Sequence, residues 1–308
     1  MIEMTQLVQF QGVAKFGNMT HASKELGVSQ PALSRAIAKL EEEFGVPLFE
    51  RKTRTLELTD AGKLLQERSR QILNILDDIK EQLRDDGQSG HLTIGAIPTI
   101  TPYFLPGFLR EFSQVYPQAK ISISERTTDQ LIQACQQGDV DLGILALPIS
   151  VKYLEVQPLM SDELLLVHAK GHELGDQDPL KLKQLADYPF VLMDEAHCLS
   201  GQIVSMCHRK NFHPVSVERT TQLATVQELV SLGHGISMIP SMACVLDHAE
   251  DRVYRRLSQP RPVRELAILT NPYRFESKLL SSLKKQLKSY AKEFEGMLQR
   301  ELGRRGEG

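Results

Sequence analysis

Two cysteines with histidine neighbours are the residues of this chain best suited to chemistry. Cys198 and Cys207 lie nine positions apart, and His197 and His208 stand beside them. Cysteine and histidine side chains serve thiol redox reactions, nucleophilic catalysis and zinc binding. Free cysteines are also common as small buried hydrophobes. The stretch is therefore compatible with a redox pair, an enzyme nucleophile, part of a metal site, or packing alone.

The segment between the two cysteines is predicted to be helical. The residues LSGQIVSMCHRKNF indicate a helix that begins just after Cys198, and a helix N-terminus favours the negative charge of a reactive thiolate. Because a helix rises 1.5 Å per residue, Cys198 and Cys207 would lie roughly 13 Å apart. A disulfide needs Cα atoms within about 7 Å. Linking the two thiols would therefore require the helix to unwind, and Gly201 near its start would ease this.

The composition is that of a soluble globular protein. The 308 residues are 41% hydrophobic and 24% charged, which is enough for two or three cores. No signal peptide and no apolar run long enough to span a membrane are visible, so we expect a cytoplasmic protein without a membrane partner. Standing disulfides are rare in that compartment, which favours a redox, catalytic or metal-binding role for the cysteine pair.

The N-terminal residues indicate a DNA-reading unit. Residues 20–44 are predicted to form two helices joined by a turn at Gly27, with Pro31 in the first turn of the second helix. Residues 47–59 alternate like a small hairpin, a wing. The net charge of residues 1–60 is −1, so any DNA footprint must be local, and a helical pair that only packs is the alternative. The candidate DNA contacts are Gln30, Pro31, Ser34, Arg35 and Lys39 on the second helix and Arg51, Lys52 and Arg54 on the wing.

The rest of the chain divides into a linker helix and an α/β region. Residues 59–85 are predicted to form one long helix, and residues 85–90, DDGQSG, a flexible break. Short apolar runs alternate with helical stretches from residue 91 onward, which predicts parallel α/β sheets in two lobes. We therefore expect three domains, at residues 1–58, 59–88 and 89–308. The apolar seam of the long helix, which favours a dimer, is Leu65, Ile72, Leu76, Ile79 and Leu83.

One long motif resembles a known family. Residues 22–62, ASKELGVSQPALSRAIAKLEEEFGVPLFERKTRTLELTDAG, closely resemble the signature of LysR-type transcriptional regulators. The resemblance implies a multidomain α/β protein with a winged helix-turn-helix, a linker helix and a two-lobed effector domain like a periplasmic binding protein. It also implies a homo-oligomer, usually a dimer of dimers, that binds promoter DNA and changes its contacts when an inducer acts. It implies neither an enzyme nor a cofactor.

Within that family, HCLSGQIVSMC resembles the peroxide-sensing OxyR branch. The resemblance implies that hydrogen peroxide attacks Cys198 and that Cys207 then closes a disulfide, which a thiol reductant would reset. It further implies that Thr99, Thr128 and His197 orient the peroxide.

The chain departs from the OxyR pattern at one position. The branch commonly carries a basic residue two positions after the first cysteine, where this chain has Ser200. We consider Arg209 and Arg264 as candidates to supply the missing cation.

Other functions stay open at this point. A LysR-type regulator could instead bind an organic acid, with Thr99, Thr128 and Thr225 each capping a helix that faces the cleft. A cysteine-nucleophile enzyme would need an oriented triad, which the sequence does not indicate. A metal site would use His197, Cys198, Cys207 and His208, although structural zinc ligands usually pair two to four residues apart. The remaining cysteines, Cys135 and Cys244, are interpreted as buried hydrophobes.

Overall fold

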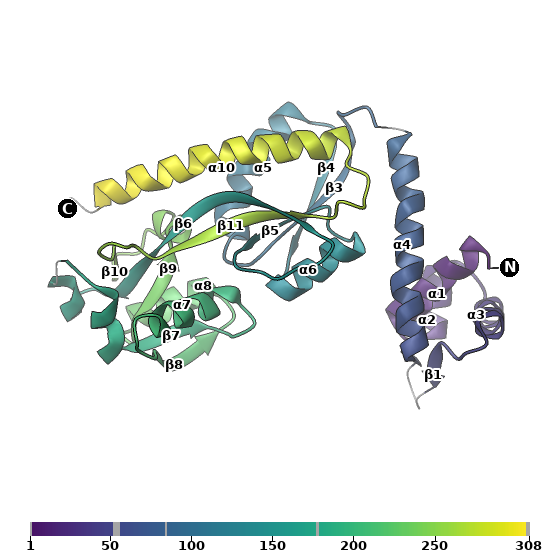
Figure 1. The fold of residues 1–308 in the computed structure, drawn as a ribbon, viewed down its shortest axis with the longest axis horizontal. Coiled ribbons are helices and arrows are strands. Elements are labelled where there is room, and N and C mark those ends of the chain that lie inside the picture. The colour runs from purple at the N-terminus through teal and green to yellow at the C-terminus, as the bar shows by residue number, and fades with distance from the viewer. Residues whose placement is uncertain (1, 52–55, 84, 177–178, 306–308) are drawn as a thin grey trace. The chain divides into compact units, whose positions relative to one another are not determined.

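The chain folds into two compact units. The computed structural model describes residues 2–51, 56–83, 85–176 and 179–305. The first unit spans residues 1–84 and the second residues 85–308 (Figure 1). In the described part of the chain, no helix is both long and apolar enough to cross a membrane.

The first unit is a helix-turn-helix with a hairpin and a long helix. Helix α3 buries Leu33, Ile37 and Leu40 against Phe10 of α1, because these positions repeat on one face of the helix. Gly27 has the expected positive φ of 65°, and Pro31 lies in the first turn of α3. The elements are α1 (Met4–Phe16), α2 (Met19–Glu25), α3 (Gln30–Phe44), β1 (Phe49–Arg51), β2 (Leu56–Leu58) and α4 (Asp60–Gln82), with β1 and β2 antiparallel.

The first lobe of the second unit is a parallel sheet covered by helices. Strand β3 pairs in parallel with β4 and with β5. A continuous apolar core fills the lobe, with Phe104, Phe108 and Phe112 of α5 among its largest members. The elements are β3 (Gly90–Ala96), α5 (Thr101–Val115), β4 (Ala119–Glu125), α6 (Thr128–Gln137) and β5 (Leu142–Ala146).

The second lobe has its own core around a smaller sheet. Strands β7 and β8 pair in parallel, and the core includes Phe190, Ile203 and Cys207. The elements are β7 (Pro189–Met193), α7 (Cys198–His208), β8 (Val215–Thr220), α8 (Leu223–Ser231), β9 (Ser237–Pro240), α9 (Ser241–Val245) and β10 (Arg252–Arg255), preceded by two 3-10 helices at Glu173–Asp176 and Leu182–Asp187.

Two long strands connect the lobes. Strands β6 (Glu155–Ala169) and β11 (Val263–Thr270) run antiparallel to each other; β11 also pairs with β5, and β6 with β9 and β10. Helix α10 (Lys278–Arg305) lies along both lobes (Figure 1). The prediction of a two-lobed α/β region is confirmed. The expected parallel pairing is found within each lobe. The strands that cross between the lobes pair antiparallel instead, because the chain passes between the lobes in both directions.

Candidate redox site

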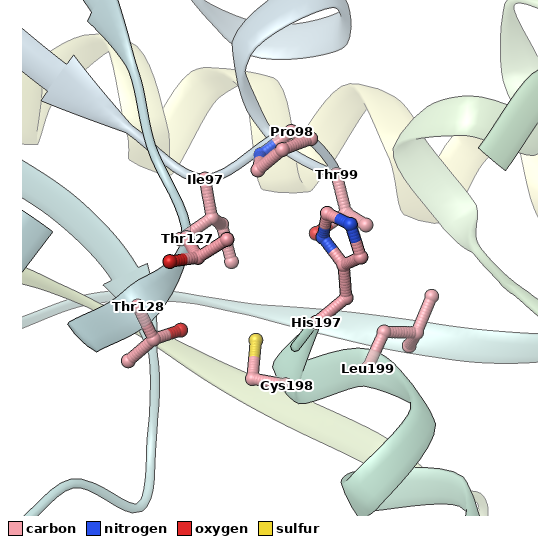
Figure 2. Close-up of a pocket in the computed structure, with 8 residues that line it drawn as sticks. All are labelled: Ile97, Pro98, Thr99, Thr127, Thr128, His197, Cys198 and Leu199. Atoms are coloured by element: carbon pink, nitrogen blue, oxygen red, sulfur yellow. The ribbon is translucent and has the colours of Figure 1, made fainter. Parts of the chain in front are cut away.

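Cys198 lies in a small pocket between the two lobes. It is the first residue of α7, so the predicted helix begins one position earlier than expected, and the residue is partly exposed. Its sulfur points into the space between Thr128 and His197 (Figure 2). Three segments line the pocket: residues 97–99 after β3, residues 127–128 at the start of α6, and residues 197–199. The sequence-predicted Thr99, Thr128, His197 and Cys198 are thus brought together in one place.

Thr99 belongs to a buried ion-pair network. Arg264 donates from Nη1 to Thr99 Oγ1 at 2.8 Å and from Nη2 to the Thr99 carbonyl oxygen at 3.1 Å. Asp162 on β6 accepts from Arg264 Nε at 2.9 Å, and Ser241 donates to the same carboxylate at 2.6 Å. Because Thr99 Oγ1 already accepts a hydrogen bond from a cation, its hydroxyl is oriented to donate. The network therefore offers the pocket a hydrogen-bond donor.

Thr128 offers the pocket a second polar group. Its Oγ1 is buried and has no hydrogen-bond partner among the described residues. A buried hydroxyl without a partner costs stability, roughly 1–3 kcal/mol. This cost is recovered when a small polar molecule enters and pairs with the hydroxyl, so Thr128 is better suited to binding than to folding.

The residues that cap the helices near the pocket are not the ones expected for a site that binds an organic acid. Ile100 is the N-cap of α5, Thr127 that of α6 and Gln222 that of α8. Thr99, Thr128 and Thr225 therefore do not cap these helices, and that expectation is wrong. Sequence reasoning missed Thr127, although its capping box with Gln130 is visible in TTDQ.

Cys207 occupies the opposite end of α7 in a different environment. It is fully buried in the core of the second lobe. Burial raises the pKa of the Cys207 thiol to about 12, so this cysteine stays protonated in the folded state. None of the four cysteines, all of which lie in the described ranges, forms a disulfide, and Cys135 and Cys244 are buried as expected. In this fold only Cys198 of the pair is open to a reagent.

Neither Arg209 nor Arg264 places a cation beside Cys198 to replace the basic residue that is missing at Ser200. Ser200 is buried, and its N–H donates to the carbonyl oxygen of His197. Arg209 follows the last residue of α7, at the far end of the helix from Cys198. Arg264 makes its hydrogen bonds to Thr99 and Asp162. Arg264 therefore acts on the pocket through Thr99 in this structure.

The metal-site alternative receives no geometric support. Cys198 and Cys207 lie nine residues apart within the continuous helix α7, and His208 Nε2 lies 2.6 Å from Nδ1 of His213. Within the described ranges, no three or more His, Cys, Asp or Glu side chains are grouped to hold a metal ion.

The candidate DNA contacts lie largely on one surface of α3. Gln30, Pro31, Arg35 and Lys39 are exposed and Ser34 is half-buried. Lys39 lies 3.6 Å from the Glu3 carboxylate, an exposed ion pair of little strength. Arg51 ends strand β1, and its side chain lies outside the described part, as do Lys52 and Arg54 altogether.

Comparisons with known proteins match both units. Residues 4–63 match the model for the bacterial regulatory helix-turn-helix protein, lysR family, and residues 85–292 match the LysR substrate binding domain. The chain is 32% identical to the DNA-binding transcriptional dual regulator OxyR of Escherichia coli K12 over 264 residues, 84% of this chain and 86% of that protein. A hydrogen peroxide-inducible genes activator of Dickeya chrysanthemi has the same identity and coverage.

Solved structures agree with these matches. A cysteine-to-aspartate variant of full-length OxyR from Pseudomonas aeruginosa superposes with a TM-score of 0.77 at 26% identity, covering 94% of this chain and 95% of that one. A peroxide-bound cysteine-to-serine variant of Corynebacterium glutamicum OxyR has a TM-score of 0.65 at 27% identity, covering 97% of each chain.

Proposed function

Because the chain belongs to the LysR family of bacterial transcriptional regulators, we propose that it binds promoter DNA and senses hydrogen peroxide through a thiol/disulfide switch between Cys198 and Cys207. The observation that carries the proposal is the pocket. A partly exposed cysteine at a helix N-terminus lies there with the hydroxyl of Thr128, which has no partner among the described residues, and the hydroxyl of Thr99, which is bound to a buried cation. The names of its relatives, which include hydrogen peroxide-inducible activators, support the same conclusion.

The first step is attack of the Cys198 thiolate on one peroxide oxygen. The S–O bond forms while the O–O bond breaks, so sulfur is oxidised to a sulfenic acid and the second oxygen leaves as hydroxide, which becomes water on taking a proton. Thr99 donates a hydrogen bond to the departing oxygen, where negative charge develops. Thr128 and His197, which lie on either side of the sulfur in Figure 2, would orient the peroxide against it.

The second step links the two cysteines. The Cys207 sulfur attacks the Cys198 sulfenic acid; the S–S bond forms, the S–O bond breaks, and the leaving hydroxide takes the Cys207 proton to give water. Both cysteines lie within the helix Cys198–His208, roughly 13 Å apart by helical rise, so α7 must unwind before they meet. Refolding of this segment is the two-state event that carries the signal. A dithiol reductant reverses it.

The DNA-reading part of the proposal rests on α3 and the wing. Gln30, Ser34 and Arg35 would contact base edges in the major groove, beside Pro31. Lys39, Arg51, Lys52 and Arg54 would contact phosphates, which position the protein without reading sequence.

The oligomer is proposed to form in part through α4. Ile72, Ile79 and Leu83 of the predicted seam are 41%, 46% and 83% exposed. Apolar side chains repeating along one helix face are stabilised by pairing with a second copy, so we propose a dimer, assembled further into a dimer of dimers.

The organic-acid alternative has weaker support. The helix caps expected for an anion at Thr99, Thr128 and Thr225 are not formed, because α5, α6 and α8 are capped by other residues.

Peptide mass spectrometry without reducing agent tests the proposal. Reduced protein is digested before and after brief exposure to a few equivalents of hydrogen peroxide. We expect a new Cys198–Cys207 linkage that disappears on treatment with a dithiol. Survival of both thiols while the exposed Met4 is oxidised would contradict the switch, and would return the organic-acid alternative.

A further inference from the structure

A hydrogen bond from Gln202 ties α7 to the first lobe. Gln202 Nε2 donates to the carbonyl oxygen of Leu147 at 2.8 Å. Leu147 directly follows β5, and its own N–H donates to the Glu265 carbonyl oxygen of β11 at 2.8 Å. The Leu147 carbonyl oxygen is therefore fixed in the sheet of the first lobe. The hydrogen bond from Gln202 connects that sheet to the helix that carries both cysteines.

Gln202 and Cys198 share one face of α7. They are four positions apart, one helical turn, and Cys198 packs against the core of the first lobe. The helix thus has two attachments, one to each lobe. The attachment to the second lobe is apolar and consists of Leu199, Ile203, Met206 and Cys207.

The amide of Gln202 is only half satisfied. Its Oε1 is buried and has no hydrogen-bond partner within the described ranges. A buried acceptor without a partner raises the free energy of the folded helical state, and water can reach it once the helix unwinds. Replacing Gln202 by alanine removes this oxygen but also takes the Gln202 donor from the Leu147 carbonyl oxygen, so these two costs offset each other and the lost hydrogen bond decides the effect.

We propose that Gln202 is a positioning residue that holds α7 against the first lobe and thereby sets the rate at which the Cys198–Cys207 disulfide closes. This inference rests on the proposed thiol switch and concerns its second step. Cys207 can reach the Cys198 sulfenic acid only after α7 unwinds, so the bond from Gln202 to Leu147 must break first. Peroxide attack does not require that break, because Gln202 is not among the residues that line the pocket.

The variant Gln202→Ala separates the two steps. Reduced full-length protein is mixed with hydrogen peroxide and quenched at intervals. Dimedone traps the sulfenic acid on Cys198, and N-ethylmaleimide followed by peptide mass spectrometry counts the disulfide. We expect an unchanged rate of sulfenic acid formation and a rate of closure increased by about two- to tenfold, the worth of one hydrogen bond.

The controls exclude a general weakening of the helix. Alanine has a higher helix propensity than glutamine, so Gln202→Ala would slow unwinding if propensity alone decided it. Ser205 is exposed on the same helix, and Ser205→Ala is expected not to speed closure. Gln202→Glu keeps the size of the side chain but replaces the donor with an acceptor that faces the Leu147 carbonyl oxygen. It should speed closure at least as much as Gln202→Ala.

Each outcome decides between the two proposals. Faster closure in Gln202→Ala and Gln202→Glu with unchanged sulfenic acid formation supports the role of Gln202. Closure at the parental rate, or slower, in both variants overturns it while leaving the thiol switch intact. Absence of sulfenic acid on Cys198 in the parent protein overturns the proposed function itself.

Discussion

The two ends of α7 place chemically identical side chains in opposite conditions. Cys198, at the N-terminus, is partly exposed in a pocket that four other polar residues also line. Cys207, near the C-terminus, is buried in apolar surroundings that raise the pKa of its thiol to about 12. This difference indicates the order in which the two cysteines would react in the proposed switch. The Cys198 thiol can meet a reagent in the folded state, whereas the Cys207 thiol can react only after α7 unwinds.

This comparison also explains why one helix is enough for a switch. The helix keeps the two sulfurs apart while it is intact, and the disulfide cannot form while the helix persists. In the proposed switch, disulfide closure and refolding of α7 are therefore the same transition, and the stability of α7 sets how readily the Cys198 sulfenic acid proceeds to the disulfide.

Replacing each cysteine by serine in turn should give the largest difference between the two ends of α7. Cys198→Ser is expected to abolish all oxidation of the pair by low peroxide, since Cys207 is shielded. Cys207→Ser should leave the first step intact and accumulate a sulfenic acid on Cys198, because no resolving thiol remains. Dimedone labelling followed by mass spectrometry measures both. Equal labelling of Cys207 in the Cys198→Ser protein would contradict the assigned order.

Thr128→Val sharpens the description of the N-terminal end of α7. The hydroxyl of Thr128 is buried and has no hydrogen-bond partner in the part of the chain that the structure describes, so its loss should leave the free energy of unfolding unchanged or raise it by up to about 1 kcal/mol. The rate of Cys198 oxidation should fall about tenfold, because a hydrogen bond to peroxide is lost. Denaturant unfolding and stopped-flow oxidation provide the two readings.

Thr99→Val is the matched comparison for Thr128→Val. It removes the acceptor of Arg264 Nη1, so it should slow oxidation and also destabilise the fold by about 1–3 kcal/mol. If both variants lose the same stability, Thr128 has a structural role and the distinction between the two hydroxyls is wrong.

Gly201→Ala tests the segment that separates the two ends. A Cβ at Gly201 would meet no atom within 4 Å, so alanine fits without strain. It should stabilise α7 by about 1 kcal/mol and slow disulfide closure about fivefold, with no change in sulfenic acid formation. Timed quenching with N-ethylmaleimide gives the closure rate. Unchanged closure would mean that helix unwinding does not limit the second step.

The pH dependence of stability tests the C-terminal end of α7. The pKa of Cys207 is raised by burial from 9.0 to about 12. Its buried thiol therefore contributes stability that is fully present below pH 9 and is lost as the pH rises from about 9 to about 12. At pH 10 the loss should be about 1 kcal/mol.

The variant Cys207→Ala isolates this contribution. It should lose less stability than the parent between pH 9 and pH 10 in urea unfolding under reducing conditions. Cys135, whose pKa burial also raises to about 12, lies in the first lobe and stays in both proteins. Identical pH dependence of parent and variant would show that Cys207 ionises freely in the folded state.

Much of this arrangement could be predicted from local sequence. The helix between the cysteines and the turn at Gly27 depend on residues close to them in the chain, so their patterns are visible without a structure. The contacts of Arg264 could not be predicted in this way. Asp162 and Thr99 lie 102 and 165 positions from it and meet it only because β6 and β11 are neighbours and the residue 97–99 segment packs beside them.

The hydrogen bonding of individual buried polar atoms could not be predicted from the sequence either. Thr128 was expected at the pocket by resemblance, but nothing in the sequence indicates that its hydroxyl lacks a partner. The role of Gln202 was likewise invisible, because its acceptor is a main-chain carbonyl 55 positions away. Such features depend on the packed surroundings of an atom, which no local pattern encodes.

Hydrogen exchange at residues 198–208 tests the central claim most directly. Reduced and peroxide-treated protein are pulsed with deuterium and digested under quench conditions, and the disulfide is confirmed in the same samples. We expect protected amides throughout α7 in the reduced protein and loss of that protection once Cys198 and Cys207 are linked. A linked protein whose α7 amides remain as protected as before would contradict the switch.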